Sequence, residues 1–284
     1  MQSQMSAQAG AAGLPKTTGS SASTGWSELW RGAYVIFHKH MYKFRTNSME
    51  IGGTLGWPLL WILTFGVGME RVVDVGTLGA NTSSYLAFIT PGIIALTALS
   101  GAVNSGMTLL EEKVKGILKE YFVAPIPRMS ILLASTASGM VKTLIQSLIL
   151  LVIAMIFGAR LDTNLVGIVL AFVVLLLFVA GFVGFSNGIA ARSKSMGGYH
   201  MVLFVLNLPL LFLSNALYPL ESMPRWMQII AYANPTTYVV DGLRQTLFAN
   251  GALPVVLSIA VLTIFAVVCQ WYGLKSFQRI LESR

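Results

Sequence analysis

Long uninterrupted apolar blocks are the feature that most limits how this chain can fold. Of its 284 residues 55% are hydrophobic and only 11% are charged, whereas a soluble domain carries roughly 25% charged residues. An apolar run of about 18 residues or more can cross a bilayer as a helix, because a helix satisfies its own backbone hydrogen bonds. The sequence therefore predicts an all-α integral membrane protein with six transmembrane helices, at about 51–69, 85–109, 132–157, 164–190, 199–217 and 252–273.

The distribution of basic residues predicts the orientation of these helices. Lysine and arginine concentrate in the cytoplasmic loops of membrane proteins. With the N-terminus inside, both termini are cytoplasmic, and the net charge of +8 is explained without a nucleic-acid partner. The predicted cytoplasmic set is Lys16, Arg31, Lys39, Lys43, Arg45, Lys113, Lys115, Lys119, Arg128, Arg192, Lys194, Lys275, Arg279 and Arg284, against Arg71, Arg160, Arg225 and Arg244 outside.

Two different segments precede the first apolar block. Residues 1–25 are rich in Ser, Ala, Gly and Gln and lack the apolar core of a signal peptide, which predicts a disordered cytoplasmic tail. Residues 26–45 put an apolar, largely aromatic helical face opposite a basic one, which favours a helix lying in the membrane interface. An amphipathic helix packed against protein would show the same pattern. The apolar face of this predicted helix consists of Trp26, Leu29, Trp30, Ala33, Phe37, Met41 and Phe44. The remaining residues, 46–284, are expected to form the six-span membrane domain.

Several classes of function are disfavoured by what the chain lacks. None of its acidic residues falls in the middle of a predicted span, whereas ion-coupled carriers usually bind the driving ion with buried ionisable groups. There is no GxxxxGK[ST] loop or HExxH motif, and Cys269 is the only cysteine. We therefore expect no catalytic residue, no cofactor-binding or metal site and no intramolecular disulfide in this chain. The histidines His38, His40 and His200 are interpreted as interfacial residues.

Lys142 is the one basic residue inside a predicted span, and Gln146 follows it one helical turn later. A charged residue at membrane depth suggests a pathway contact, such as one with an anionic substrate. Two simpler interpretations are that the long side chain reaches back to the head groups or that it contacts Gln146. The pair is retained as a possible pathway element.

Two pairs of glycines with GxxxG spacing, Gly52/Gly56 and Gly184/Gly188, permit close contact between helices. The spacing is common in a glycine-rich membrane protein. We expect these pairs to serve packing within one subunit rather than dimerisation.

The loop between the second and third spans contains a short amphipathic pattern at 111–124. Its apolar residues recur at i, i+3, i+4, i+7 and i+8 opposite charged residues, and Pro125 and Pro127 stop it. A rigid cytoplasmic helix of this kind suits docking into a groove on a soluble partner, although a solvated loop helix remains the alternative. The apolar positions are Val114, Ile117, Leu118, Tyr121 and Phe122.

The outer segment at 218–250 is too long for a simple link and too apolar for a free loop. Pro219, Pro224 and Pro235 divide it, and Trp226 and Tyr238 are among its large side chains. Irregular backbone at membrane depth must be shielded by protein or line a cavity. We expect short re-entrant helices that close the outer end of a pathway. Asp241 and Arg244, at i and i+3, could form an exposed pair that contributes little to stability.

These two segments carry a family resemblance. The stretch KGILKEYFVAPIPR, Lys115 to Arg128, is similar to the loop after the second span of type-2 ABC exporter permeases, which include daunorubicin and polysaccharide exporters. The stretches YPLESMPRWM at 218–227 and NPTTYVVDGLR at 234–244 resemble the pattern near the last span of that family. Asn207 departs slightly from the pattern, where an apolar or small hydroxyl residue is usual.

The resemblance implies an assembly and a role for each segment. Two copies of the chain would form the pathway in the inner membrane of a prokaryote. Two ABC ATPase subunits, which hold ATP and magnesium, would bind to them from the cytoplasm. Residues 26–45 would be the connecting helix. The helix at 111–124 would be the coupling helix, with Glu112, Gly116, Leu118, Glu120, Phe122, Pro125 and Arg128 as coupling residues. The outer gate would consist of Pro219, Pro224, Trp226, Pro235, Tyr238 and Arg244.

The resemblance also orders the candidate functions. We expect an ATP-driven exporter of an amphiphilic drug or lipid-like molecule, in contact with membrane lipid. Export of a lipid-linked polysaccharide is the alternative, since aromatic side chains could line a sugar-stacking channel, although they also gather at membrane interfaces. A stand-alone channel or an ion-coupled carrier, which would transport without an ATPase partner, is the third hypothesis.

Overall fold

Helix is the regular secondary structure throughout the part of the chain that the computed structural model describes, which comprises residues 26–69, 84–123 and 127–282. The tail at 1–25 and Pro125 lie outside these residues. In chain order the elements are α1 (Trp26–Thr46), α2 (Ser48–Trp61), the π-helix η1 (Ile62–Val67), α3 (Tyr85–Val114), α4 (Ile117–Val123), α5 (Arg128–Ile156), α6 (Leu165–Arg192), α7 (Met196–Phe212), the short 3₁₀-helix η3 (Leu220–Ser222), α8 (Arg225–Ala233), α9 (Pro235–Phe248) and α10 (Val255–Glu282).

The described residues contain four helices that are long and apolar enough to cross a membrane, Tyr85–Val114, Met129–Ile156, Leu165–Arg192 and Val255–Arg279. Two shorter apolar helices, Leu55–Gly66 and Met196–Phe212, coincide with the other two predicted spans. Pro58 lies inside α2, which continues directly into η1. A proline removes a backbone hydrogen bond, and π-turns and neighbouring helices commonly compensate for this in membranes. The prediction of an all-α membrane protein agrees with this arrangement.

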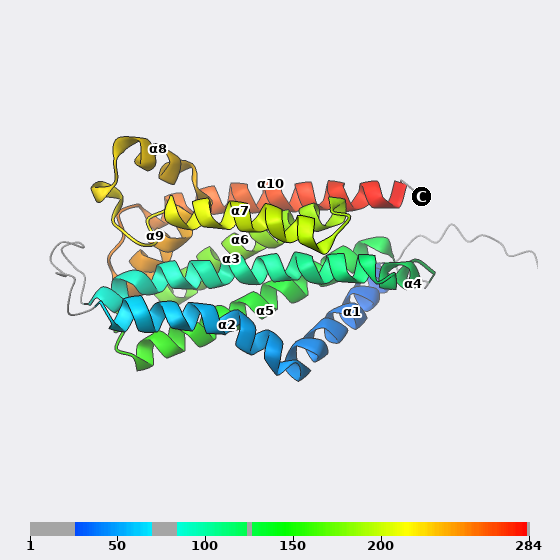
Figure 1. Ribbon diagram of the computed structural model, residues 1–284, viewed down its shortest axis with the longest axis horizontal. Coiled ribbons are helices and arrows are strands. Elements are labelled where there is room, and N and C mark those ends of the chain that lie inside the picture. Colours follow the sequence, from blue (N-terminus) through cyan, green and yellow to red (C-terminus); the bar gives the residue numbers. More distant parts are fainter. Residues whose placement is uncertain (1–25, 70–83, 124–126, 283–284) are drawn as a thin grey trace, which may run out of the picture.

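The long helices run side by side along one axis of the molecule (Figure 1). α4 and the C-terminal end of α10 lie at one end, and α8 and α9 lie at the other. α3 is buried along most of its length and packs against α5, α6, α7 and α9. A helix that is apolar on all sides belongs in a core, and α3 is accordingly the central element.

Helix α1 packs against the other helices on one side and is exposed on another. Ala33, Ile36 and Phe44 are buried on the side that packs against α5. Trp26 and Trp30, which the sequence put on the same apolar face, are 80% and 60% exposed. The aromatic flank of α1 is therefore open to its surroundings while a neighbouring stripe holds the helix to the bundle. Its location in the membrane interface stays a prediction.

The predicted single helix at 111–124 is wrong in its extent. α3 continues to Val114, Gly116 adopts φ = +81°, and a separate helix α4 begins at Ile117. The left-handed conformation is accessible to glycine without a steric penalty and ends helices. Because the break changes the helical phase, Val114 is 55% exposed whereas Leu118 is 4% exposed. These two residues do not share one apolar face.

The outer segment is divided at its prolines, as the sequence predicts. Pro219 precedes η3, Pro224 precedes α8, and Pro235 is the first residue of α9. Nearly all of α9 is buried among α3, α6 and α10, whereas Trp226 of α8 is 61% exposed. The re-entrant position of these helices in the membrane stays a prediction.

The two GxxxG pairs behave differently. A Cβ atom built on Gly184 would lie 2.9 Å from the Cα of Gln270, and one on Gly188 would lie 3.2 Å from the Cα of Gly273. This pair therefore allows α6 to contact α10, as expected for packing within the subunit. Gly52 and Gly56 have no atom within 4 Å of such a position, so their predicted packing role is wrong for the described residues.

Gly184→Val tests the contact between α6 and α10. A larger side chain must push the α10 backbone away, and overpacking of this kind costs about 1–3 kcal/mol. We expect a lower midpoint for thermal unfolding of the purified chain in detergent. Gly197→Ala, at a helical position with open space around it, is the control and should leave the midpoint unchanged or slightly raised. Equal midpoints for the two variants would contradict the close contact.

Candidate functional site

A buried carboxylate joins four helices at the end of the molecule that carries α4. Glu112 Oε1 accepts hydrogen bonds from Lys39 Nζ at 3.2 Å and from the Tyr121 hydroxyl at 3.2 Å, and it lies 3.1 Å from His40 Nε2. Lys39 Nζ also donates to the Tyr121 hydroxyl at 2.6 Å. His40 Nδ1 is 2.9 Å from Ser138 Oγ. We call Lys39, His40, Glu112, Tyr121 and Ser138, which come from α1, α3, α4 and α5, the Glu112 cluster.

The contacts in the Glu112 cluster favour charged side chains that are held in fixed positions. Glu112 is 6% exposed, and a buried carboxylate is tolerated when charged or hydrogen-bonding partners surround it. Partial burial lowers the pKa of Lys39, but its hydrogen bond to Tyr121 and the charge of Glu112 outweigh that effect and raise the pKa above its ordinary value. Lys39 is therefore an ammonium ion paired with Glu112. The ring of His40 is buried within this cluster, and its location at the membrane interface stays a prediction.

α4 is attached on one side and accessible on the other. Leu118 packs into an apolar cluster that includes Ile36 and Ile131, from α1 and α5, and Tyr121 binds the Glu112 cluster. Glu120 is exposed. α4 is thus a short helix that Leu118 and Tyr121 fix to the bundle. Of the other predicted coupling residues, Gly116 is the break before α4, Phe122 lies within α4, and Arg128 begins α5.

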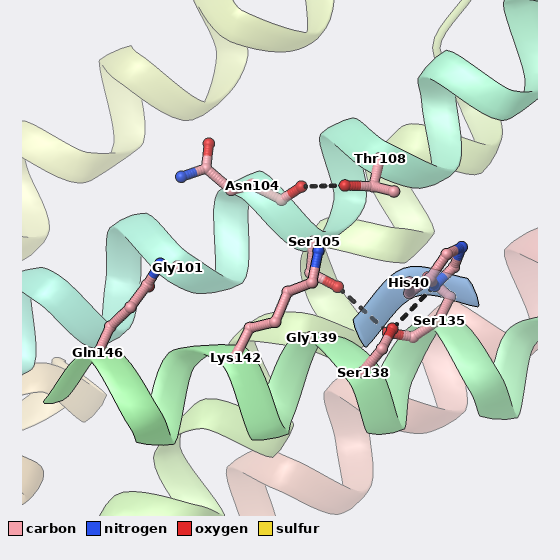
Figure 2. A pocket seen from close by; sticks show the side chains of 10 residues that line it. All are labelled: His40, Gly101, Asn104, Ser105, Thr108, Ser135, Ser138, Gly139, Lys142 and Gln146. Atoms are coloured by element: carbon pink, nitrogen blue, oxygen red, sulfur yellow. Dashed lines mark hydrogen bonds between the residues drawn. The ribbon is translucent and has the colours of Figure 1, made fainter. Parts of the chain in front are cut away.

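A narrow polar cleft runs between α3 and α5, next to α1 (Figure 2). The side chains of Lys142 and Gln146 point from α5 toward α3 (Figure 2), and Lys142 Nζ lies 5.3 Å from the centroid of the Phe44 ring. The predicted pathway pair therefore shares one cleft, while its contact with a substrate stays a prediction. Every residue that lines the cleft is polar or glycine: His40, Gly101, Asn104, Ser105, Thr108, Ser135, Ser138, Gly139, Lys142 and Gln146.

At the opposite end, Asn215 bridges two buried charged side chains. Its amide donates to Asp241 Oδ1 at 3.3 Å, and its backbone carbonyl accepts from Arg244 Nη2 at 3.1 Å. The Arg244 guanidinium also donates to the Phe88 carbonyl at 3.1 Å and lies 4.0 Å from the centroid of the Phe88 ring. Asp241 accepts backbone hydrogen bonds from the residues that lead into α10, Ala252 and Leu253.

The exposed pair expected at Asp241 and Arg244 is therefore a wrong prediction. Both side chains are buried, because α3, α6 and α10 surround α9. Among the other predicted gate residues, Tyr238 donates from its hydroxyl to the Tyr232 carbonyl at 2.7 Å. Trp226 lies apart from the buried group, on the exposed side of α8. Pro219, Pro224 and Pro235 set helix boundaries.

The sequence reasoning missed His40 and Asn215 as site residues. His40 lies 72 positions from Glu112 in the chain, and Asn215 lies 26 positions from Asp241. No local pattern reports such pairings. The one signal available was that Asn215 is a polar residue near the end of the predicted span at 199–217, where a buried amide needs hydrogen-bond partners.

Comparisons with known proteins agree on a single family. Residues 33–248 match the family described as ABC-2 type transporter. The chain is 33% identical over 265 residues to a putative transport permease, ycf38, of Cyanophora paradoxa, covering 88% of this chain and 89% of that protein. It is 26% identical over 239 residues to the inner membrane transport permease YadH of Escherichia coli K12, covering 84% and 91%. It is 24% identical over 248 residues to the daunorubicin resistance permease DrrB1 of Streptomyces coeruleorubidus, covering 84% and 82%.

Tyr121→Phe tests whether the hydroxyl ties α4 to the bundle. The substitution keeps the ring but removes the donor to Glu112 and the acceptor for Lys39, which costs about 1–3 kcal/mol for a bond to a charged group. We expect amide hydrogen exchange across residues 117–123 to rise by about 5- to 100-fold, while the middle of α3 stays protected. Tyr218→Phe is the matched control, because its hydroxyl contacts the Phe212 carbonyl at the other end. Unchanged exchange in α4 would show that Leu118 alone holds it.

Asp241→Asn tests the buried group at the opposite end. The amide nitrogen cannot accept a hydrogen bond, so at least one of the donors from Asn215, Ala252 or Leu253 loses its partner. Leaving a buried donor unsatisfied costs about 1–3 kcal/mol, and we expect thermal stability to fall accordingly. Asp162→Asn, at an exposed carboxylate, is the control. A melting temperature for Asp241→Asn equal to that of the control would contradict this role.

Proposed function

Because the chain belongs to the ABC-2 type transporter family, we propose that this permease is the membrane subunit of an ATP-driven exporter for an amphiphilic drug or lipid-like molecule. The ATPase that supplies the energy is a separate ABC chain, which holds ATP and magnesium. In this arrangement the permease contributes the pathway and a surface that receives the motion of the ATPase.

The observation that carries the proposal is the attachment of α4. This short helix lies at one end of the bundle, with Leu118 in an apolar cluster and Tyr121 hydrogen-bonded to Glu112 and Lys39. Glu120 of the same helix is exposed. A partner that displaces α4 would displace α1, α3 and α5 with it, since all four helices contribute side chains to the Glu112 cluster. α4 therefore acts as the coupling helix, and α1 acts as the connecting helix beside it.

The cargo class is supported by the distribution of polar groups. The long helices are apolar at their outward faces, while the cleft between α3 and α5 is lined by polar residues and glycines. A pathway that combines both surfaces suits a molecule with an apolar body and a polar group. The relative DrrB1 is named for daunorubicin resistance, which is consistent with this class.

The membrane arrangement follows from the same assignment. With α4 in the cytoplasm, both termini are cytoplasmic, the four long helices cross the inner membrane, and α2 with η1 and α7 supply two further spans. The relative YadH is named as an inner membrane permease. α8 and α9 then form the outer re-entrant segment. A second copy of the chain completes the pathway, supported by exposed apolar side chains on α2, η1 and α7: Trp57, Leu60, Leu63, Met201, Phe204 and Val205.

The double substitution Glu120→Lys with Phe122→Asp tests the docking role of α4. It reverses one charge and places another on the helix that would contact the ATPase. We expect at least about tenfold weaker association, about 1.4 kcal/mol, measured as the amount of co-expressed ABC ATPase that co-purifies with the permease and as ATP hydrolysis stimulated by amphiphiles.

Glu221→Lys is the control, because it makes an equal charge reversal at an exposed residue of the opposite end. It should leave ATPase association unchanged. Normal association of the double variant would contradict the assignment of α4. Transport by the permease alone in liposomes, driven only by an ion gradient, would overturn the ATP-driven function itself.

A further inference from the structure

A groove at the junction of α1 and α5 combines a cation, aromatic rings and an apolar floor. Five residues of α1 line it, His38, Met41, Tyr42, Phe44 and Arg45, together with Ile145 of α5. We propose that this groove binds an anionic phospholipid of the surrounding bilayer, with the lipid phosphate on Arg45 and an acyl chain over Phe44 and Ile145. The proposal needs the membrane location that follows from the family, and it is independent of ATPase coupling and cargo.

The position of Arg45 in the chain is the one expected for a residue at the level of the lipid phosphates. Arg45 is the second-last residue of α1, α2 begins at Ser48, and the apolar helix Leu55–Gly66 follows about two turns later. From this spacing we expect Arg45 where the chain passes from polar surroundings into hydrocarbon. Exposed aromatic side chains gather at such boundaries, and α1 exposes Trp30, Tyr34 and Tyr42 along its outer flank.

The basic side chains near the end of α1 differ in whether they are paired with a carboxylate. Lys39 is paired with Glu112, and Lys43 Nζ lies 3.7 Å from Glu111 Oε2. Arg45 is exposed, and none of the six residues that line the groove is acidic. A guanidinium donates two parallel hydrogen bonds to a phosphate. The groove thus offers complementary charge to an anionic head group at its polar end.

An apolar surface continues from the groove in the direction of the hydrocarbon. Ile145 also lines a second groove between α5 and α6, where every other lining residue except Ser147 is apolar. Its exposed walls include Leu148 of α5 and Phe172 of α6. One amphiphile could therefore place its head at Arg45 and extend a chain along α5. A second copy of the permease would cover the apolar part but would leave the cation at Arg45 without an explanation.

Native mass spectrometry of the delipidated full-length permease tests the site. The protein would be titrated with dioleoyl phosphatidylglycerol and, separately, with dioleoyl phosphatidylcholine. We expect the wild type to prefer the anionic lipid, and Arg45→Gln to weaken that lipid about fivefold, the effect of one cation near a membrane surface. Arg45→Lys should retain part of the preference. Ile145→Asp should weaken both lipids, because it places a carboxylate on the apolar floor.

Arg279→Gln is the matched control, since Arg279 is an exposed cation in the last turn of α10 and does not line the groove. It should bind phosphatidylglycerol like the wild type. The proposal is overturned by equal weakening in Arg279→Gln, by unchanged binding in Arg45→Gln, or by displacement of the lipid with millimolar inorganic phosphate, which would indicate a site for soluble anions. Dissociation of a dimer by Ile145→Asp with unchanged lipid binding would instead assign the groove to a second copy.

Because the experiment uses the permease chain alone, its outcome is separate from the association with the ATPase. Melting temperatures of the variants are measured alongside. Arg45 is exposed, so Arg45→Gln should fold as the wild type does, and a fivefold change in lipid affinity at an unchanged melting temperature identifies loss of the contact rather than of the fold.

Discussion

The shared carboxylate of Glu112 is the interaction on which the α4 end of the molecule depends. A buried carboxylate requires partners with good geometry, and here they come from α1 and α4, while His40 of α1 connects the group to Ser138 of α5. The positions of α1, α4 and α5 relative to α3 are therefore linked, because a shift of one helix alone would leave a buried polar group unsatisfied. A helix that receives force from outside needs such an attachment, since a flexible loop would absorb the motion.

α3 connects this end of the molecule to the other. It supplies Glu112 near its last turn, and near its first turn it supplies the Phe88 carbonyl and ring that contact Arg244. Between them its surface is almost entirely buried against other helices. Both buried polar groups thus contact the same helix, with the polar cleft between α3 and α5 alongside. This is a spatial connection, and it identifies α3 as the element whose displacement would reach both ends.

α1 illustrates how one amphipathic helix serves several contacts. Its buried stripe of Ala33, Ile36 and Phe44 packs against α5, Lys39 and His40 enter the Glu112 cluster, and its aromatic flank faces outward. The sequence offered a membrane interface or a protein surface as alternatives for this helix. The structure assigns different faces to protein contact and to exposure, so the alternatives are not mutually exclusive. Arg45 at its end falls on the exposed side, beside the groove that we assign to lipid.

The sequence by itself determined the helical class, the approximate limits of the apolar helices and the proline boundaries of the outer segment. These properties follow from local physics, because the length of an apolar run and the missing N–H of proline act within a few residues. Tertiary structure alone decided that Gly116 separates α4 from α3, that Asp241 and Arg244 are buried around Asn215, and that His40 meets Glu112. The last two depend on residues far apart in the chain. Their energies arise only when packing removes the polar groups from water, which no local pattern encodes.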